Sequence, residues 1–271
     1  MSKVRLPPFA VRRRILRTIL LSGGVLGAAL SGYLPVIYAE KKRLRPPGAL
    51  DEKDFLASCI KCGQCVQVCP VQAIKLSDLV DGFGVGTPHI EARQQACDFS
   101  CDAVQCILAC PTGALAYEKP ALLSVRPGAP LAAKPTLLAK ENDPEPTLNL
   151  EERIGVARLT RPESCLARQG KGFKGQARGA QFQGKLRYMS VDRWKPIKVA
   201  DHPYDTAVCD LCVQACPIKG AISIETVTAA DGKSYRSPVV HEPCVGCGAC
   251  EMICPTEQPC IEVVPGEGWN T

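Results

Sequence analysis

The sequence predicts an α+β fold with small sheets, long irregular loops and one N-terminal helix. Three observations predict it. The 271 residues include 17 cysteines, and all but Cys165 and Cys260 fall in four groups that each end in Cys-Pro. A short alternating apolar stretch follows each group, as is typical of a short strand. Aromatic residues make up only 5% of the chain, so the large side chains that usually fill a core are scarce.

Residues 1–45 are predicted to form a signal or membrane anchor. Val11–Arg17 reads Val-Arg-Arg-Arg-Ile-Leu-Arg, which is close to a twin-arginine signal, and the uncharged run Thr18–Ala39 follows. This run is long enough to cross a bilayer as a helix. It is longer than the apolar core of a usual signal peptide, and Ile37 stands where a cleavage site needs a small residue. The sequence therefore favours an uncleaved anchor over a cleaved signal.

Basic residues flank this run on both sides, with a small excess before it. By the positive-inside rule, the excess predicts a cytoplasmic N-terminus and a body outside the cytoplasm. A plain anchor with a cytosolic body is the alternative.

The first cysteine motif begins the region 46–118. Cys59–Pro70 reads C-x2-C-x2-C-x3-C-P, the spacing with which bacterial ferredoxins hold [4Fe–4S] clusters. Three thiolates two residues apart can surround one cube, and the fourth points toward a neighbouring cube. The lead-in Arg45–Leu50 is predicted to be extended, Asp51–Ala57 to form a helical turn or two, and Ala73–Leu76 to form a strand. Residues 78–90 are predicted to be a glycine-rich loop.

The second motif is Cys97-x3-Cys101-x4-Cys106-x3-Cys110-Pro111. Its first two gaps are longer than those of the first motif, so the loop must bulge, yet three thiolates can still converge on one cube. A four-cysteine zinc site is the alternative, although zinc ligands usually come as two well-separated pairs. The residues after Pro111, 112–117, repeat the strand-like pattern. A proline-rich linker, predicted to be mostly irregular, covers 119–163, and within it residues 148–159 could add one short helix or strand.

The third motif, Cys209-x2-Cys212-x3-Cys216-Pro217, is one ligand short. Cys165 upstream is the favoured donor. Cys260 is an alternative donor, and a three-cysteine [3Fe–4S] site is another possibility. The fourth motif, Cys244–Pro255, repeats the spacing of the first, and alternating apolar residues follow both motifs. Metal binding should therefore supply much of the folding free energy of the region 164–271.

A basic insertion, 166–208, lies inside this second region. It could be an electrostatic docking arm for an acidic partner or lipid headgroups, or simply a solvated loop. Its Gly179-x4-Gly184-Lys185 imitates a phosphate loop, but Leu186 replaces the required Ser or Thr, so no nucleotide site is predicted. The basic residues are Arg168, Lys171, Lys174, Arg178, Lys185, Arg187, Arg193, Lys195 and Lys198.

Composition excludes several other functions. A net charge of +6 is too modest to indicate nucleic-acid binding. No CxxC is followed by His, so c-type haem is not indicated. His89, His202 and His241 match no catalytic pattern, and we find no nucleophile or acid–base pair. The chain is predicted to be an electron carrier rather than an enzyme.

The predicted cofactors are four [4Fe–4S] clusters, which makes the chain a polyferredoxin with a bacterial-ferredoxin-like fold. Tandem modules would pair motif one with two and three with four. A nested arrangement would pair one with four and two with three. The predicted ligands are Cys59, Cys62, Cys65, Cys69, Cys97, Cys101, Cys106, Cys110, Cys165, Cys209, Cys212, Cys216, Cys244, Cys247, Cys250 and Cys254.

These motifs resemble those of the NapG/MauM family of ferredoxin-type electron-transfer proteins. The resemblance covers the twin-arginine start, the Arg45–Leu50 lead-in, the Gly82–Pro88 loop and all four motifs. In that family the third motif also takes its first cysteine from upstream, which supports Cys165.

The resemblance implies a role in passing electrons from a membrane quinol-oxidising iron–sulfur partner to a periplasmic acceptor, a cytochrome c or a reductase. Because clusters are generally built in the cytosol, an exported cluster protein must cross folded, which fits the twin-arginine start. The expected location is the periplasmic side of the bacterial inner membrane. The alternatives are an electron-transfer subunit of a larger molybdenum-type oxidoreductase and, in another class, a disulfide-stapled extracellular binding module.

Overall fold

The structure, a computed structural model, describes residues 8–38, 42–78, 84–99, 101, 104–116, 154–188, 195–228 and 234–266. Most of the predicted linker, 119–153, lies outside these described residues. The chain divides into two compact units, one of Met1–Lys41 with Asp78–Val85 and one of Lys42–Ser77 with Gly86–Thr271.

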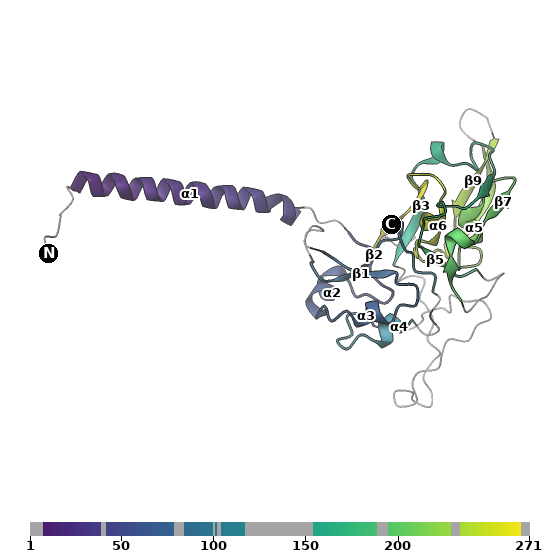
Figure 1. The fold of residues 1–271 in the computed structure, drawn as a ribbon, viewed down its shortest axis with the longest axis horizontal. Helices are drawn as coiled ribbons and strands as arrows, with labels where there is room; N and C mark the ends of the chain where they lie inside the picture. The colour runs from purple at the N-terminus through teal and green to yellow at the C-terminus, as the bar shows by residue number, and fades with distance from the viewer. Residues whose placement is uncertain are drawn as a thin grey trace. The chain divides into compact units, whose positions relative to one another are not determined.

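The first unit contains helix α1, Pro8–Tyr38, which Figure 1 shows as one continuous helix. Its segment Arg12–Ser31 is apolar, with a mean hydropathy of 1.3 and no buried side chain. By length and composition this segment could cross a membrane, and a signal sequence would have the same properties. The prediction of one apolar N-terminal helix is confirmed. Its role as a membrane anchor or as a signal stays a prediction.

The second unit is a mixture of short helices and strands. Its helices are α2 Glu52–Ser58, α3 Gln64–Gln67, α4 Gln105–Leu108, η3 Pro162–Ser164, η4 Val199–Asp201, α5 Leu211–Gln214 and α6 Ala249–Ile253. Its strands are β1 Ile74–Leu76, β2 Pro88–Ile90, β3 Gly155–Leu159, β4 Phe173–Gly175, β5 Lys185–Leu186, β6 Ile197–Lys198, β7 Tyr204–Thr206, β8 Ile222–Thr228, β9 Ser234–Val240 and β10 Ile261–Pro265.

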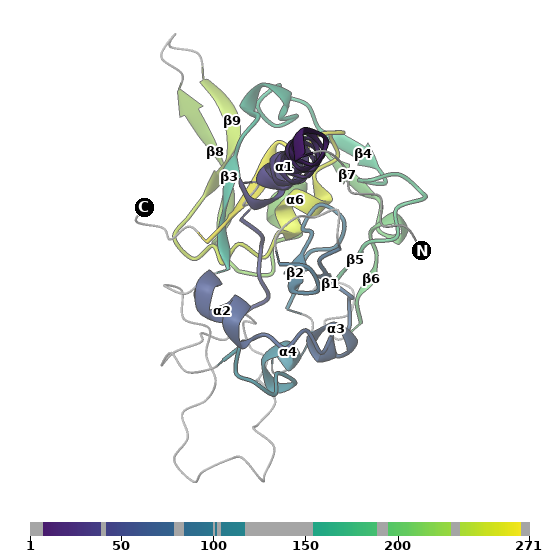
Figure 2. The same ribbon diagram turned by 90° about the vertical axis from the view of Figure 1, so that its left-hand side faces the viewer.

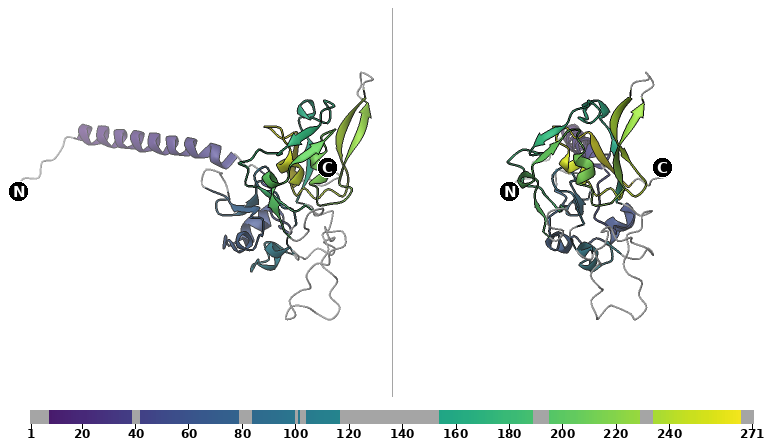
Figure 3. Two further views of the ribbon diagram at one scale, coloured as in Figure 1. Left: turned by 45° about the vertical axis from the view of Figure 1, so that its right-hand side comes forward. Right: turned by 90° about the vertical axis from the view of Figure 1, so that its right-hand side faces the viewer.

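In the part of the chain that the structure describes, the strands pair as antiparallel two-stranded ribbons: β1–β2, β3–β10, β4–β7, β5–β6 and β8–β9. The longest is β8–β9, in which Ile222 pairs with Val240 and Thr228 with Ser234 (Figure 3). β3 lies beside β9, as Figure 2 shows. Small ribbons bury little apolar surface alone, so their stability depends on what they pack against.

Several predicted elements are present. The helix expected before the first motif is α2, and the strands expected after motifs one, three and four are β1, β8 and β10. β3 is the strand expected near the end of the linker.

Two local predictions were wrong. Pro88–Ile90, expected to be loop, forms β2 and pairs with β1, where proline is tolerated as the first residue of a strand. After motif two, Leu115 makes only an isolated bridge with Ala49 instead of starting a strand.

The core of the second unit is continuous across both motif regions. Phe55 from the first region and Leu211, Met252 and Ile253 from the second belong to the same buried cluster. Much of the rest of this cluster is cysteine and alanine. With so few large apolar side chains, the sulfur atoms themselves provide a substantial part of the core.

The lead-in to the first motif is held by a buried arginine. The Arg45 guanidinium donates hydrogen bonds to both carboxylate oxygens of Glu52, at 2.9 and 2.5 Å. It also donates to Thr87 Oγ1 at 3.0 Å and to the Pro88 carbonyl at 2.8 Å. A planar guanidinium suits such bidentate pairing. Arg45 therefore ties the start of α2 to β2, and residues of both elements border the first cysteine site.

Candidate metal centres

Each of the four motifs forms a short helix that carries one cysteine, and a second cysteine follows four residues later, at or beyond the helix end. The pairs are Cys65 and Cys69 at α3, Cys106 and Cys110 at α4, Cys212 and Cys216 at α5, and Cys250 and Cys254 at α6. Because the chain leaves the helix before the second cysteine, the two thiols of each pair can serve different sites.

Site I is a hollow bordered by three cysteines of the first motif and the last cysteine of the second, namely Cys59, Cys62, Cys65 and Cys110. Apolar side chains such as Phe55 and Leu115 complete the lining. Burial, and then the neighbouring thiols of Cys59, Cys62 and Cys110, raise the pKa of Cys65 to about 11.

Site II gathers Cys69, Cys97, Cys101 and Cys106. Burial is the largest cause that raises the pKa of Cys106 well above its usual value, followed by the nearby thiols of Cys101, Cys69 and Cys65. Burial, and then Cys101 and Cys106, do the same for Cys97. Cys106 is therefore close to Cys69 as well as to Cys101, and helices α3 and α4, which carry these two loops, contact each other, which groups the last cysteine of motif one with the first three of motif two.

Site III is a hollow bordered by Cys165, Cys209, Cys212 and Cys254, with Cys260 on the same wall. Burial is the largest cause that raises the pKa of Cys212 well above its usual value, and Cys209, Cys165 and Cys254 add to it. The structure thus brings Cys165 next to the third motif from its upstream position. It brings Cys260 there as well, so the choice between these two ligands stays a prediction.

Site IV is a hollow bordered by Cys244, Cys247, Cys250 and Cys216. Burial, and then the thiols of Cys247, Cys244, Cys212 and Cys216, raise the pKa of Cys250 well above its usual value. Motif four therefore supplies three cysteines here, and motif three supplies the fourth.

The four sites show a reciprocal exchange within two pairs. Sites I and II exchange the last cysteines of motifs one and two, and sites III and IV exchange those of motifs three and four. This is the tandem arrangement. All 17 cysteines lie in described residues as free thiols.

The donor set and the shape fit a multi-iron cluster. The hollows of sites I, III and IV are partly open to solvent, and their walls are almost wholly apolar apart from sulfur. Among the described residues, no three His, Cys, Asp or Glu side chains close on one point as ligands of a single ion would. Four sulfurs spread around a hollow can instead each bind a different iron of a cube.

Burial raises the pKa of several of these thiols, so a metal that binds them as thiolates has to displace their protons. Burial and the neighbouring thiols disfavour a free thiolate, whereas iron binds cysteine as the thiolate. At three of the sites, a backbone N–H group donates a hydrogen bond to one cysteine sulfur. Ala73 donates to Cys69 Sγ at 3.3 Å, Leu115 to Cys110 Sγ at 3.4 Å and Cys260 to Cys254 Sγ at 3.3 Å. At Cys110, burial raises the pKa, but the hydrogen bonds from Leu115, Thr112 and Ala114 outweigh it and lower the pKa.

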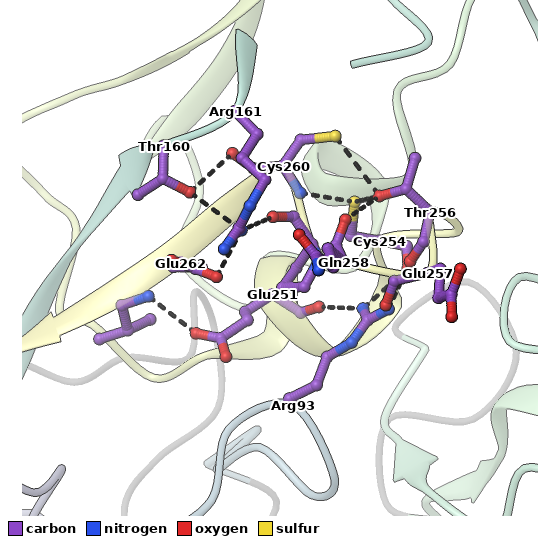
Figure 4. A network of polar contacts seen from close by, with 12 residues as sticks. Arg93, Thr160, Arg161, Glu251, Cys254, Thr256, Glu257, Gln258, Cys260 and Glu262 are labelled. Carbon is purple, nitrogen blue, oxygen red and sulfur yellow. Dashed lines mark hydrogen bonds and ion pairs between the residues drawn. The ribbon is translucent and has the colours of Figure 1, made fainter. Parts of the chain in front are cut away.

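Arg93, which lies between motifs one and two, contacts the turn after Cys254 (Figure 4). Its guanidinium donates to the carbonyls of Glu251 and Cys254, both at 2.8 Å, and to those of Thr256 at 2.5 Å and Glu257 at 3.0 Å. These carbonyls follow a short helix and have no partners within it. Arg93 thus positions the loop that carries Cys254, a predicted ligand of site III.

The same turn is held from its other side by Arg161, which donates to the Pro259 carbonyl at 2.6 Å and pairs with Glu262 at 2.6 Å (Figure 4). The Glu251 carboxylate accepts the Val263 N–H at 2.8 Å. Together these contacts fix the Cys254–Cys260 segment against β10.

The basic insertion is partly used inside the protein. Arg178 donates to the carbonyls of Arg93 and Met252, both at 3.0 Å. Lys174 forms an exposed ion pair with Asp205 at 2.7 Å. Lys185 begins β5 instead of a helix, so the phosphate-loop geometry is not formed there. The docking prediction for this insertion stays untested.

The three histidines contact residues outside the cysteine sites. His89 lies in β2 and contacts Ser77, and His202 stacks on Tyr188 with ring centroids 3.9 Å apart. His241 contacts Ser223 at 2.7 Å and Glu225 at 3.1 Å.

Sequence reasoning missed Arg93 and the sulfur of Met252, which joins the two motif regions by accepting the Ala96 N–H at 3.2 Å. It named Arg178 only as part of the basic insertion and missed its internal contacts. No local pattern marks these residues, since their partners are distant in the sequence.

Comparisons with known proteins agree with this geometry. The family described as a 4Fe-4S dicluster domain matches residues 58–114 and 207–258, which hold motifs one with two and three with four. Cys165 and Cys260 lie outside both matches.

Three relatives match most of the chain. The chain is 34% identical over 261 residues to the ferredoxin-type protein NapG of Escherichia coli (strain K12), covering 94% of this chain and 85% of that protein. It is 33% identical over 267 residues to the methylamine utilization ferredoxin-type protein MauM of Methylorubrum extorquens, covering 96% and 92%. The MauM protein of Paracoccus denitrificans is 32% identical over 247 residues, covering 90% and 80%. No solved structure matches the chain.

Proposed function

The chain belongs to the NapG/MauM family of ferredoxin-type proteins and is an iron–sulfur electron-transfer protein, and from this premise we propose that it holds four [4Fe–4S] clusters, one at each of sites I to IV. One observation carries the proposal. The hollows of sites I and IV are each bordered by three cysteines of one motif and the last cysteine of the neighbouring motif, and that of site III by Cys209, Cys212, the upstream Cys165 and the last cysteine of motif four, with apolar groups in the rest of each wall. That is the ligand exchange expected of two-cluster ferredoxins.

When bound, such a cluster takes up and releases one electron without making or breaking a substrate bond. The chain's own residues hold it and shield it. Cysteine thiolates bind the irons, apolar walls limit the access of water, and N–H groups directed at Cys69, Cys110 and Cys254 stabilise negative charge on sulfur. We assign no substrate site to this chain and therefore propose a carrier rather than an enzyme.

We further propose that electrons come from a membrane quinol-oxidising iron–sulfur protein and leave to a periplasmic cytochrome c or reductase. The family supports this role, since its members named above are ferredoxin-type proteins, two of them of methylamine utilization. Helix α1 would then serve as an uncleaved anchor, with the cysteine-rich unit on the periplasmic side of the inner membrane. The basic residues that precede its apolar segment support this orientation.

The test is to count iron and acid-labile sulfide in anaerobically purified protein and to record the EPR spectrum after dithionite reduction. We expect about 16 of each per chain and interacting [4Fe–4S] signals. About eight of each would show that only one pair of sites is filled, and a colourless protein would overturn the proposal. Stable co-purification with a molybdenum protein would instead indicate a subunit of a larger oxidoreductase.

A further inference from the structure

The segment Ala92–Asp98 of the first motif region lies directly against motif four. The Cys97 N–H donates to the Cys247 carbonyl at 3.2 Å. One residue earlier, the Ala96 N–H donates to Met252 Sδ at 3.2 Å. Cys97 belongs to site II and Cys247 to site IV, so a backbone hydrogen bond joins a predicted ligand of one pair of sites to a predicted ligand of the other.

We propose that the Cys97–Cys247 contact is the electron crossing between the two pairs, so that the sites are used in the order I, II, IV, III or its reverse. This inference rests on the proposed function and adds to it the route within the chain. In the crossing step one electron leaves site II, which is oxidised, and enters site IV, which is reduced. No bond forms or breaks, and no proton has to move.

The covalent connection makes this contact a suitable path. It runs from the Cys97 sulfur through Cβ, Cα and the N–H, across the hydrogen bond to the Cys247 carbonyl, and through Cα and Cβ to the Cys247 sulfur. Within each pair, one short helix and its end supply one cysteine to each of the two sites, which keeps those two sites adjacent. Sites I and III are then the two ends of the chain of sites.

Gly248 permits this close approach. A Cβ added at Gly248 would lie 2.4 Å from the Ala92 Cβ, which is closer than real Cβ contacts allow. The backbone of Gly248 also has a φ of +88°, a conformation that side chains disfavour. Glycine at this position therefore lets the first region lie against the loop that carries Cys247.

Further contacts clamp the crossing on both sides. Arg93 binds the carbonyls at the end of α6, and Arg178 bridges the carbonyls of Arg93 and Met252. On the other side the buried Asp98 accepts the Arg187 N–H at 2.8 Å. Together these hydrogen bonds hold the segment around Cys97 in place against motif four, and they fix the distance between Cys97 and Cys247.

The experiment is a rescue series in the full-length, cluster-loaded protein. Gly248→Ala should push the two regions apart, because its methyl meets Ala92. The double variant Gly248→Ala with Ala92→Gly removes the Cβ that is struck and should restore the contact. Gly220→Ala is the matched control, since Gly220 has a similar φ of +78° and nothing within 4 Å of its added Cβ.

Two readouts are compared, hydrogen exchange of the Cys97 amide and the magnetic coupling between reduced site II and reduced site IV in the EPR spectrum. We expect Gly248→Ala to lose amide protection and inter-pair coupling, the double variant to regain both, and Gly220→Ala to keep both. The crossing is wrong if Gly248→Ala keeps its full iron content and its inter-pair coupling. It is also wrong if the double variant fails to regain amide protection and inter-pair coupling while Gly220→Ala behaves like the unmodified protein.

A second measurement does not depend on the folding of Gly248→Ala. In otherwise unmodified protein, Cys101→Ser at site II should change the inter-pair coupling, whereas Cys62→Ser at site I should leave it unchanged. Coupling that responds to Cys62→Ser and not to Cys101→Ser would overturn the order of sites. Iron and sulfide content distinguish the two proposals, because low iron in the unmodified protein contradicts the clusters themselves rather than the crossing.

Discussion

The two pairs of sites exchange their last cysteines in the same way but differ in how deeply the cysteines are buried. Among the predicted ligands of sites III and IV, only Cys212 and Cys216 are not buried. Among those of sites I and II, only Cys65 and Cys106 are buried, and Cys62 is exposed. Ile60, beside Cys59, is 64% exposed. The motif therefore sets the ligand geometry, and the surrounding chain sets the access of solvent.

The residues that line sites III and IV explain why the cysteines of these sites are more deeply buried. Residues of the β3–β10 and β8–β9 ribbons line the hollows of the second pair, whereas among the described residues no ribbon of that length lines the hollow of site I. Arg93 from the first region is also committed to the second. Burial makes it harder to change the charge of a cluster and shields its cysteines from oxidants. Site I is therefore the more accessible end, both for electron exchange with a partner and for reaction with an oxidant.

Removal of the metal should have the largest effect. If the iron is chelated anaerobically, the hollows lose their occupant, and burial disfavours the thiolate form of cysteines such as Cys247 and Cys250, whose pKa values it raises well above the usual value. We expect the metal-free chain to lose cooperative thermal unfolding by circular dichroism, because metal binding contributes folding free energy. Hydrogen exchange should rise more in 205–266 than in 42–78. An unchanged melting curve without iron would contradict the idea that the sites hold the fold together.

Cys165→Ser tests the ligand that is least certain from the sequence. If Cys165 binds at site III, its loss should remove about four irons per chain or leave a three-iron cluster. Cys260→Ser is the control, because Cys260 borders the same hollow, and it should leave the iron count unchanged. The reverse result, in which only Cys260→Ser lowers the iron content, would assign the ligand to Cys260. The first pair has no such spare cysteine.

Arg93→Ala tests how far the second region depends on the first. Four carbonyls would lose a charged donor, at a cost of about 2 kcal/mol, which lowers the melting midpoint of a chain this size by about 4–8 °C. Lys75→Ala, which breaks an exposed pair with Glu91, is the control and should change the midpoint by less than about 2 °C. Equal effects of the two substitutions would show that the contacts of Arg93 stabilise nothing.

The difference in burial predicts an order of oxidative damage. After a short exposure to air, alkylation and peptide mapping should label Cys59, Cys62, Cys65 and Cys110 before the cysteines of site IV, since Cys62 is exposed and Cys244, Cys247 and Cys250 are buried. Labelling of site IV first would mean that burial does not govern access.

The smallest effect is expected in the basic insertion. Lys174→Ala breaks an ion pair whose side chains are 81% and 73% exposed, so its effect on stability should be within about 0.5 kcal/mol. Arg178→Ala removes bonds to two carbonyls and should cost about 1–2 kcal/mol. If neutralising Lys171, Lys174 and Arg178 also leaves the electron-transfer rate and membrane retention unchanged at low salt, the insertion is not a docking arm.

The sequence by itself determined which residues are candidate ligands and where several short elements lie. The cysteine spacing is a local property, because a loop of a few residues can surround a cube only at certain separations. The same local logic placed α2, β1, β8 and β10. The local pattern gave the wrong prediction at Pro88, where strand β2 forms. This strand pairs with β1, and the Arg45 guanidinium donates to the Pro88 carbonyl. Both partners are brought there by the fold and not by the local sequence.

Only the tertiary structure decided how the motifs combine. The sequence allowed tandem or nested pairs, and the short helices α3 to α6 decide for tandem pairs by directing their second cysteines to a neighbouring hollow. The placement of Cys165 beside Cys209, the grip of Arg93 on the turn after Cys254, and the contact of Cys97 with Cys247 all join residues far apart in the chain. Such contacts follow from packing and backbone hydrogen bonding between segments, which no spacing along one segment encodes.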